Sequence, residues 1–161
     1  MVVDTSVIIN FIHIKRLDLL GNLPGYRFVI PDHVLEEIER ERQKEALRDA
    51  LSAGYVSLVS ITDPEEIGLY GRNTRIMGKG ESACLAIAQK RRWFIASDEK
   101  RRFRREAVKR LGEGKILTTP GILLMAIKAG ILSVEEADRA KAILEGCRFR
   151  MTFKSFSDLL G

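Results

Sequence analysis

The stretch MVVDTSVIIN, residues 1–10, decides the fold. Two valines lead into an acidic residue, two hydroxyl residues follow, and apolar residues then recur at helical spacing. This pattern predicts a buried strand that ends on Asp4 and a helix that begins directly after it. In an open parallel sheet, ligands bind in the crevice at the carboxyl ends of the strands. We therefore expect Asp4 at the floor of such a crevice.

The rest of the chain alternates short apolar runs with helical patterns. Further strands are expected at residues 27–30, 56–61, 93–97 and 115–118. One helix or two are expected over residues 7–20, a long or broken helical arm over 33–54, and a short helix that begins at 62–64. Further helices are expected over residues 81–92, 100–111, 122–129, 133–146 and 153–160. The Gly-, Arg- and Asn-rich residues 68–80 are expected to form a mobile connection. Strands that alternate with helices predict an α/β fold with a parallel sheet.

Composition limits the class of protein. The 161 residues fit one domain, and 45% apolar with 30% charged residues is typical of a globular chain. No apolar run approaches the roughly 20 residues of a membrane span, and no secretory signal is evident, so we expect a cytoplasmic protein without a membrane partner. Cys84 and Cys147 are too few for a disulfide framework or a Cys-based zinc site. The net charge of +5 is compatible with a nucleic-acid partner.

Acidic residues far apart in the sequence are predicted to meet at one edge of the sheet. In a right-handed βαβ arrangement, the carboxyl ends of strands and the amino ends of helices share that edge. Asp4 and Asp98 each close a predicted strand, Glu81 lies in the first turn of a helix, and Glu36 or Glu37 lies near the start of another.

Helical geometry distinguishes the last two glutamates. Val34, Leu35 and Ile38 define the apolar stripe of their helix. At about 100° per residue, Glu37 lies roughly 105° from the centre of this stripe and Glu36 roughly 155°. A side chain at the boundary of the stripe can reach a pocket beside the sheet, whereas the opposite one points to water. We therefore prefer Glu37.

Each acidic residue also has a simpler interpretation. Asp98 could cap the helix that follows it, Glu81 could interact with the helix dipole, and Glu37 could be one more charge on a solvated arm. Considered together, clustered carboxylates repel one another, and a divalent cation relieves that repulsion. Oxygen ligands suit Mg²⁺ or Mn²⁺, which can promote phosphodiester hydrolysis.

Four segments together resemble the PIN-domain ribonucleases, of which the VapC-type toxins are the best-known group. They are DTS at residues 4–6, PDHVLEEI at 31–38, GKGES at 78–82 and SDEK at 97–100. The resemblance implies a three-layer α/β/α sandwich with a central, mostly parallel sheet, and Mg²⁺- or Mn²⁺-dependent cleavage of single-stranded RNA. It also implies a homodimer and, for toxin members, an antitoxin partner.

The resemblance assigns roles residue by residue. Asp4, Glu37, Glu81 and Asp98 match the four catalytic and metal-binding acids, and Ser6 and Ser97 match auxiliary hydroxyls. Many relatives have Asp-Asp where this chain has Asp98 and Glu99, so either residue could face the metal. Residues 133–161 form a helical extension beyond the minimal domain, within a single domain spanning 1–161.

A basic segment follows the predicted acidic edge directly. Residues 100–110 carry seven cationic side chains, among them the candidate RNA-binding residues Arg101, Arg102, Arg104 and Arg105. They could hold RNA phosphates, or they could form a solvated helix face that balances acidic helices elsewhere.

Three functions are compared. The first is a metal-dependent endoribonuclease, with a toxin role as its narrower form. The second is a non-catalytic PIN-like module that binds RNA or protein, with acids too far apart to hold a metal. The third, a phosphatase with a covalent phosphate on Asp4, is disfavoured because Ser6 replaces the second Asp usual two residues later.

Overall fold

The computed structural model describes residues 1–161 and contains a five-stranded sheet with the order β3-β2-β1-β4-β5. The strands are β1 (Val2–Val3), β2 (Val29–Pro31), β3 (Ser57–Val59), β4 (Ile95–Ala96) and β5 (Ile116–Leu117). All four ladders are parallel, which confirms the predicted α/β fold with a parallel sheet. The order changes direction at β1, so the crevice between the ends of β1 and β4 is the topological switch point where such sheets bind ligands.

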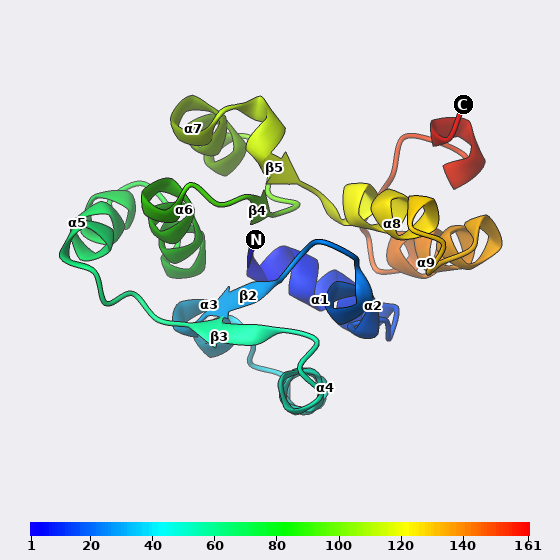
Figure 1. Ribbon diagram of the computed structural model, residues 1–161, viewed down its shortest axis with the longest axis horizontal. Coiled ribbons are helices and arrows are strands. Elements are labelled where there is room, and N and C mark those ends of the chain that lie inside the picture. Colours follow the sequence, from blue (N-terminus) through cyan, green and yellow to red (C-terminus); the bar gives the residue numbers. More distant parts are fainter.

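Helices cover both faces of the sheet. They are α1 (Thr5–His13), α2 (Asp18–Asn22), α3 (Asp32–Glu37), α4 (Glu41–Ser52), α5 (Pro64–Asn73), α6 (Lys79–Arg91), α7 (Arg102–Leu111), α8 (Thr119–Lys128) and α9 (Val134–Gly146), with 3₁₀ turns η1 (Glu113–Lys115) and η2 (Phe156–Leu159). Figure 1 shows α5, α6 and α7 on one side of the sheet and α1, α2, α8 and α9 on the other. The predicted three-layer α/β/α arrangement is therefore confirmed. None of these helices has the length and apolar character needed to traverse a lipid bilayer.

Small residues let α6 lie close against the sheet. Every residue from Ser82 to Ala88 is buried, and this run contains three alanines, a serine and a cysteine. Helix α6 contacts β1, β2 and β4 directly. The buried residues Ala137 and Leu144 of α9, and Phe156 of η2, belong to the same apolar cluster as Val2 of β1.

Residues 68–73 differ from the prediction. They were expected in a mobile connection over residues 68–80, but α5 runs from Pro64 to Asn73 and α6 begins at Lys79, so the expectation is wrong for residues 68–73 and 79–80. Asp63 is the N-cap of α5, and its side chain accepts hydrogen bonds from the N–H groups of Glu65 (2.8 Å) and Glu66 (3.3 Å), which stabilises the start of the helix. Packing of α5 against α6 then outweighs the weak helix propensity of Gly68 and Gly71.

The start of α3 and the start of β4 also differ from the predicted boundaries. The helix expected from residue 33 begins one residue earlier, because Asp32 is the first residue of α3 and Pro31 is its N-cap. Trp93 and Phe94 were expected within a buried strand, but β4 contains only Ile95 and Ala96, and both aromatic rings are half-buried.

An ion pair between a buried carboxylate and a partly exposed guanidinium joins α5 to α6. Glu66 is only 1% exposed, and its carboxylate accepts two hydrogen bonds from the guanidinium of Arg91, at 2.5 and 2.9 Å. The same guanidinium lies 5.0 Å from the ring centroid of Trp93. The preceding residues form a parallel pair at the surface, where Lys90 contacts Glu65. One turn of α6 therefore carries a buried and an exposed ion pair side by side.

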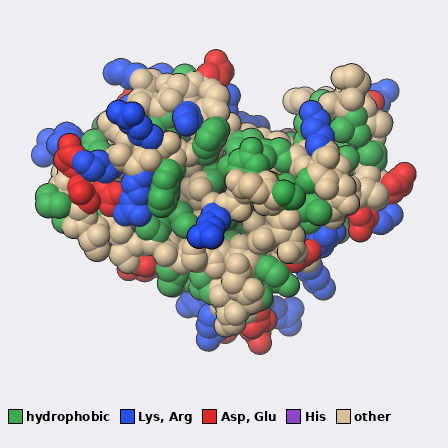
Figure 2. Space-filling model, viewed as in Figure 1, with side chains coloured by type: hydrophobic (Ala, Val, Ile, Leu, Met, Phe, Trp, Pro, Cys, Tyr) green, Lys and Arg blue, Asp and Glu red, His purple; other side chains and the backbone are tan.

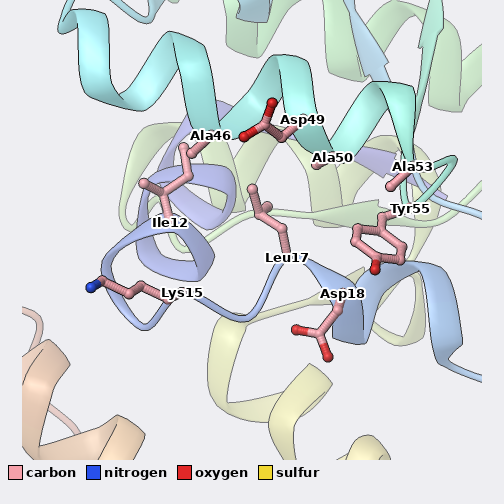
Figure 3. A pocket seen from close by; sticks show the side chains of 9 residues that line it. All are labelled: Ile12, Lys15, Leu17, Asp18, Ala46, Asp49, Ala50, Ala53 and Tyr55. Carbon is pink, nitrogen blue, oxygen red and sulfur yellow. The ribbon is translucent and has the colours of Figure 1, made fainter.

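A cavity of about 360 Å³ lies between the end of α1 and α4 (Figure 3). Ile12, Leu17, Ala50 and Tyr55 contribute to its apolar lining. Helix α1 begins directly after Asp4 and runs away from it, so this cavity lies at the end of α1 remote from that carboxylate. It is separate from the acidic site described next.

Candidate functional site

Asp4 lies buried between the ends of the two central strands. Its backbone N–H donates to the carbonyl of Ala96 (2.9 Å), and the residue is 2% exposed. Its Oδ2 atom accepts hydrogen bonds from the hydroxyls of Ser6 (2.9 Å) and Ser97 (3.0 Å). Burial raises the pKa of Asp4 to about 6, because desolvation outweighs these hydrogen bonds.

The hydroxyls of Ser6 and Ser97 each connect the Asp4 carboxylate to the loop after β4. The Ser6 hydroxyl also accepts from the backbone N–H of Asp98, and the Ser97 hydroxyl accepts from the N–H of Glu99, both at 3.1 Å. Each serine thus donates to Asp4 and accepts from the loop that follows β4. The two hydroxyls tie the ends of β1 and β4 together and fix the Asp4 carboxylate.

Asp98 is held by a different set of donors. Its Oδ1 atom accepts from the backbone N–H of Thr119 (2.8 Å), and its Oδ2 atom accepts from the side-chain amide of Asn10 (2.9 Å) and from the Thr119 hydroxyl. Burial raises the pKa of Asp98. The carboxylate therefore satisfies the amino end of α8, rather than that of α7, the helix that follows it in sequence.

Glu37 and Glu81 reach the same edge from two helices. Glu37 ends α3, and its carboxylate accepts from the backbone N–H of Gly80 (2.8 Å) and from the Thr5 hydroxyl. Glu81 folds back to accept from the N–H of Gly78 (3.1 Å), as in a capping box.

Gly80 is required for the close approach of Glu37. A Cβ atom at this position would lie 2.5–2.7 Å from the carboxylate atoms of Glu37, which is closer than van der Waals contact allows. We expect Gly80→Ala to leave the fold intact, because a flexible side-chain end can move away, but to displace Glu37. Any activity that depends on the Glu37 carboxylate should fall about tenfold or more, whereas the thermal midpoint should change little. Gly78→Ala is the matched control, since a Cβ there meets only Glu81, at 3.8 Å. Equal activity of the two variants would contradict this role.

Glu99 completes the acidic cluster, which we define as Asp4, Glu37, Glu81, Asp98 and Glu99. Partial burial, then repulsion from Glu81, Asp98 and Glu37, raises the pKa of Glu99. Beneath the cluster, burial raises the pKa of the Cys84 thiol, and the charges of Asp4, Glu37 and Glu81 add to this effect. These mutual effects show that carboxylates from separate segments share one electrostatic environment.

The cluster has the donor chemistry of a magnesium or manganese site. All five members offer carboxylate oxygens, which hard divalent cations prefer. As the side chains stand, no group of three or more His, Cys, Asp or Glu residues is arranged to hold a metal ion. In this arrangement, Glu37, Glu81 and Asp98 each accept a hydrogen bond from a backbone N–H group.

The candidate RNA-binding arginines lie in and just before α7, and they have different surroundings. Arg102 donates to the carbonyl of Ile76 (2.8 Å), while Arg101 and Arg105 are exposed. Arg104 lies 3.6 Å from Glu113, a residue that is itself largely exposed. Figure 2 shows that Lys and Arg side chains gather over the part of the molecule formed by α5, α6 and α7. Arg105 also lies 3.9 Å from Glu106, but its side chain, like that of Arg101, is exposed to solvent.

Four residues that position the acids were not singled out from the sequence. They are Thr5, Asn10, Gly80 and Thr119. Asn10 carried a detectable signal, because it is the one amide in the otherwise apolar stretch VIINFI and lies four residues after Ser6. Nothing in the sequence near Thr119 indicated a partner 21 residues earlier.

Comparison with known proteins agrees with this geometry. The family model DUF3368, described as a PIN domain, matches residues 1–159. No curated protein matches the chain. PIN domains are generally nucleases, and they typically use divalent metal ions. With nearly its whole length matched, the chain belongs to the PIN-domain family.

Proposed function

We propose that the chain is a metal-dependent endoribonuclease that cleaves single-stranded RNA. The observation that carries this proposal is the convergence of carboxylates at one edge of the sheet, in a protein whose net charge is +5. Ser6 and Ser97 join the Asp4 carboxylate to the backbone of Asp98 and Glu99, and Glu37 accepts from Gly80, the residue before Glu81. Carboxylates at the edge and cations around it match the needs of phosphodiester hydrolysis, because the cations attract the RNA backbone.

The acidic cluster would hold Mg²⁺ or Mn²⁺. Such an ion, when bound, supplies activation of water and stabilisation of negative charge on the phosphate. Ser6 and Ser97 hold the Asp4 carboxylate in one orientation, and Asn10 and Thr119 do the same for Asp98. Gly80 and Thr5 hold Glu37. The exposed arginines at the start of α7 would bind phosphates along the strand.

A narrower form of the proposal makes the chain the toxin of a toxin–antitoxin pair, acting as a homodimer and silenced by an antitoxin protein. Its support is the resemblance of the four sequence segments to VapC-type toxins. A second candidate function is a non-catalytic RNA-binding module. The observation that favours it is that no three carboxylates are arranged to hold an ion.

The test is a cleavage assay on fluorogenic single-stranded RNA with Mn²⁺, Mg²⁺ or EDTA. Glu37→Gln and Glu36→Gln form a matched pair of neighbouring variants, since both glutamates are exposed but only Glu37 contacts Gly80. We expect cleavage with either metal, none in EDTA, a loss of about 10²-fold or more in Glu37→Gln, and near-normal activity in Glu36→Gln.

The outcomes separate the candidates. Cleavage that persists in EDTA would contradict metal dependence. Equal activity of the two variants would remove Glu37 from the site. Binding of RNA without cleavage at any metal concentration would favour the non-catalytic module.

A further inference from the structure

A cavity of about 360 Å³ opens beside the acidic cluster. Asp98 and Glu99 form one part of its wall, Lys100 and Arg104 another, and residues 149–153 close the far side. Figure 2 shows the surface hollowed between the regions where Figure 1 labels α7 and the C-terminal segment. The volume falls within the roughly 300–1,000 Å³ of small-molecule pockets.

The far wall is fixed at both of its ends. At its start, the N–H of Phe149 donates to the carbonyl of Leu144 (2.9 Å) in the last turn of α9. At its end, the Asp138 carboxylate accepts from the Ser155 hydroxyl (2.6 Å) and from the N–H of Phe156 (2.8 Å). The segment from 149 to 153 is therefore held across α9, and its side of the cavity is formed before any ligand arrives.

The wall combines aromatic and cationic side chains. Phe149, Met151 and Phe153 line the cavity, and the ring of Phe153 is supported edge-on by Phe156, with centroids 4.9 Å apart. Arg150 lies on the same wall and is exposed. Aromatic faces stack on nucleobases, and arginine and lysine bind phosphates.

We propose that this cavity is a subsite for one nucleotide of the RNA strand, immediately beside the phosphodiester presented to the acidic cluster. Its base would lie against the wall of residues 149–153, and Lys100, Arg104 and Arg150 would contact its phosphate. This inference rests on the proposed ribonuclease function, and it gives residues 133–161 a role in binding substrate. Apolar and cationic walls that meet at Asp98 and Glu99 suit a nucleotide better than a purely anionic ligand, which would have no use for the aromatic side chains.

The experiment measures RNA binding separately from cleavage. Fluorescein-labelled single-stranded RNA is titrated into the Asp4→Asn chain in EDTA, and anisotropy gives Kd. Arg150→Glu and Arg148→Glu are the matched pair: both arginines are exposed and they are two residues apart, but only Arg150 lines the cavity. A second series moves a single abasic nucleotide along the strand.

We expect Arg150→Glu to weaken binding about tenfold and to lower the salt slope by about 0.7, while Arg148→Glu changes both much less. One abasic position should weaken binding about tenfold, and Arg150→Glu should reduce that penalty.

Each other outcome decides between the proposals. Equal effects of the two charge reversals, or abasic penalties that are uniform along the strand, would overturn the subsite even if the chain cleaves RNA. A position-dependent penalty in a chain that never cleaves would support the subsite and reject the ribonuclease. Absence of RNA binding would reject both.

Discussion

Asp4→Asn is expected to abolish RNA cleavage and, at the same time, to make the protein more stable. Asp4 is the most buried member of the acidic cluster and lies where the sheet changes direction. Removing its charge takes away the carboxylate around which the site is built, so activity should fall by about 10³-fold or more. The asparagine carbonyl can still accept hydrogen bonds from Ser6 and Ser97, so the fold should be kept.

The gain in stability follows from the pKa of Asp4. Burial raises it from 3.8 to about 6, so the folded state binds this proton more tightly than the unfolded state does. The free energy of unfolding must then fall as pH rises from about 4 to about 6, and it stays lowered above pH 6. The ionised carboxylate costs about 3 kcal/mol at pH 7 and about 1 kcal/mol at pH 4.5. Asp4→Asn should recover most of this amount.

Urea unfolding in EDTA at the two pH values measures the effect. Asp49→Asn is the control, because Asp49 is exposed on α4 and should change the free energy of unfolding by less than about 0.5 kcal/mol at either pH. A destabilised Asp4→Asn protein, or one that is stable and fully active, would contradict the assignment of Asp4.

Among the substitutions proposed in this Discussion, Arg91→Ala is expected to lower the free energy of unfolding the most. It leaves the carboxylate of Glu66 buried at 1% exposure without its cation, and such a change typically costs about 3–5 kcal/mol. The same substitution removes the cation above the Trp93 ring. Thermal and urea unfolding should both show the loss.

The exposed ion pair between Lys90 and Glu65 provides the control for Arg91→Ala. Lys90→Ala removes a cation one residue away, but Lys90 and Glu65 are both well exposed, so the cost should stay below about 1 kcal/mol. The double variant Glu66→Gln/Arg91→Ala should recover much of the lost stability, because no unpaired charge remains buried. If Arg91→Ala and Lys90→Ala cost the same, the buried pair contributes no more than the surface pair.

Much of the fold could be predicted from local patterns. The apolar residues before Asp4 and the helical patterns of residues 81–92 and 133–146 each predicted an element that the structure contains. Residues 68–73 could not be placed correctly, because their glycines favour a loop locally. Packing of α5 on α6 and the Glu66–Arg91 pair, which depend on residues far along the chain, decided the outcome.

The site was harder to predict from the sequence than the fold. Parallel topology predicted that the acids would share an edge, because that follows from strand direction alone. It could not predict which donors each carboxylate faces: Asp98 turns to Thr119, and Glu37 turns to Gly80. These contacts depend on side-chain directions across three helices, which spacing in the sequence does not encode.

The position of β1 between β2 and β4 also has a consequence for biosynthesis. The ribosome makes Asp4 and Ser6 early, but β4, which pairs with β1, and Ser97, the second hydroxyl donor to Asp4, lie about sixty per cent of the way along the chain. Thr119, which orients Asp98, is made later still. A nascent chain that ends before these residues carries the first acid without its surroundings. The completed site therefore forms only when most of the chain has emerged from the ribosome.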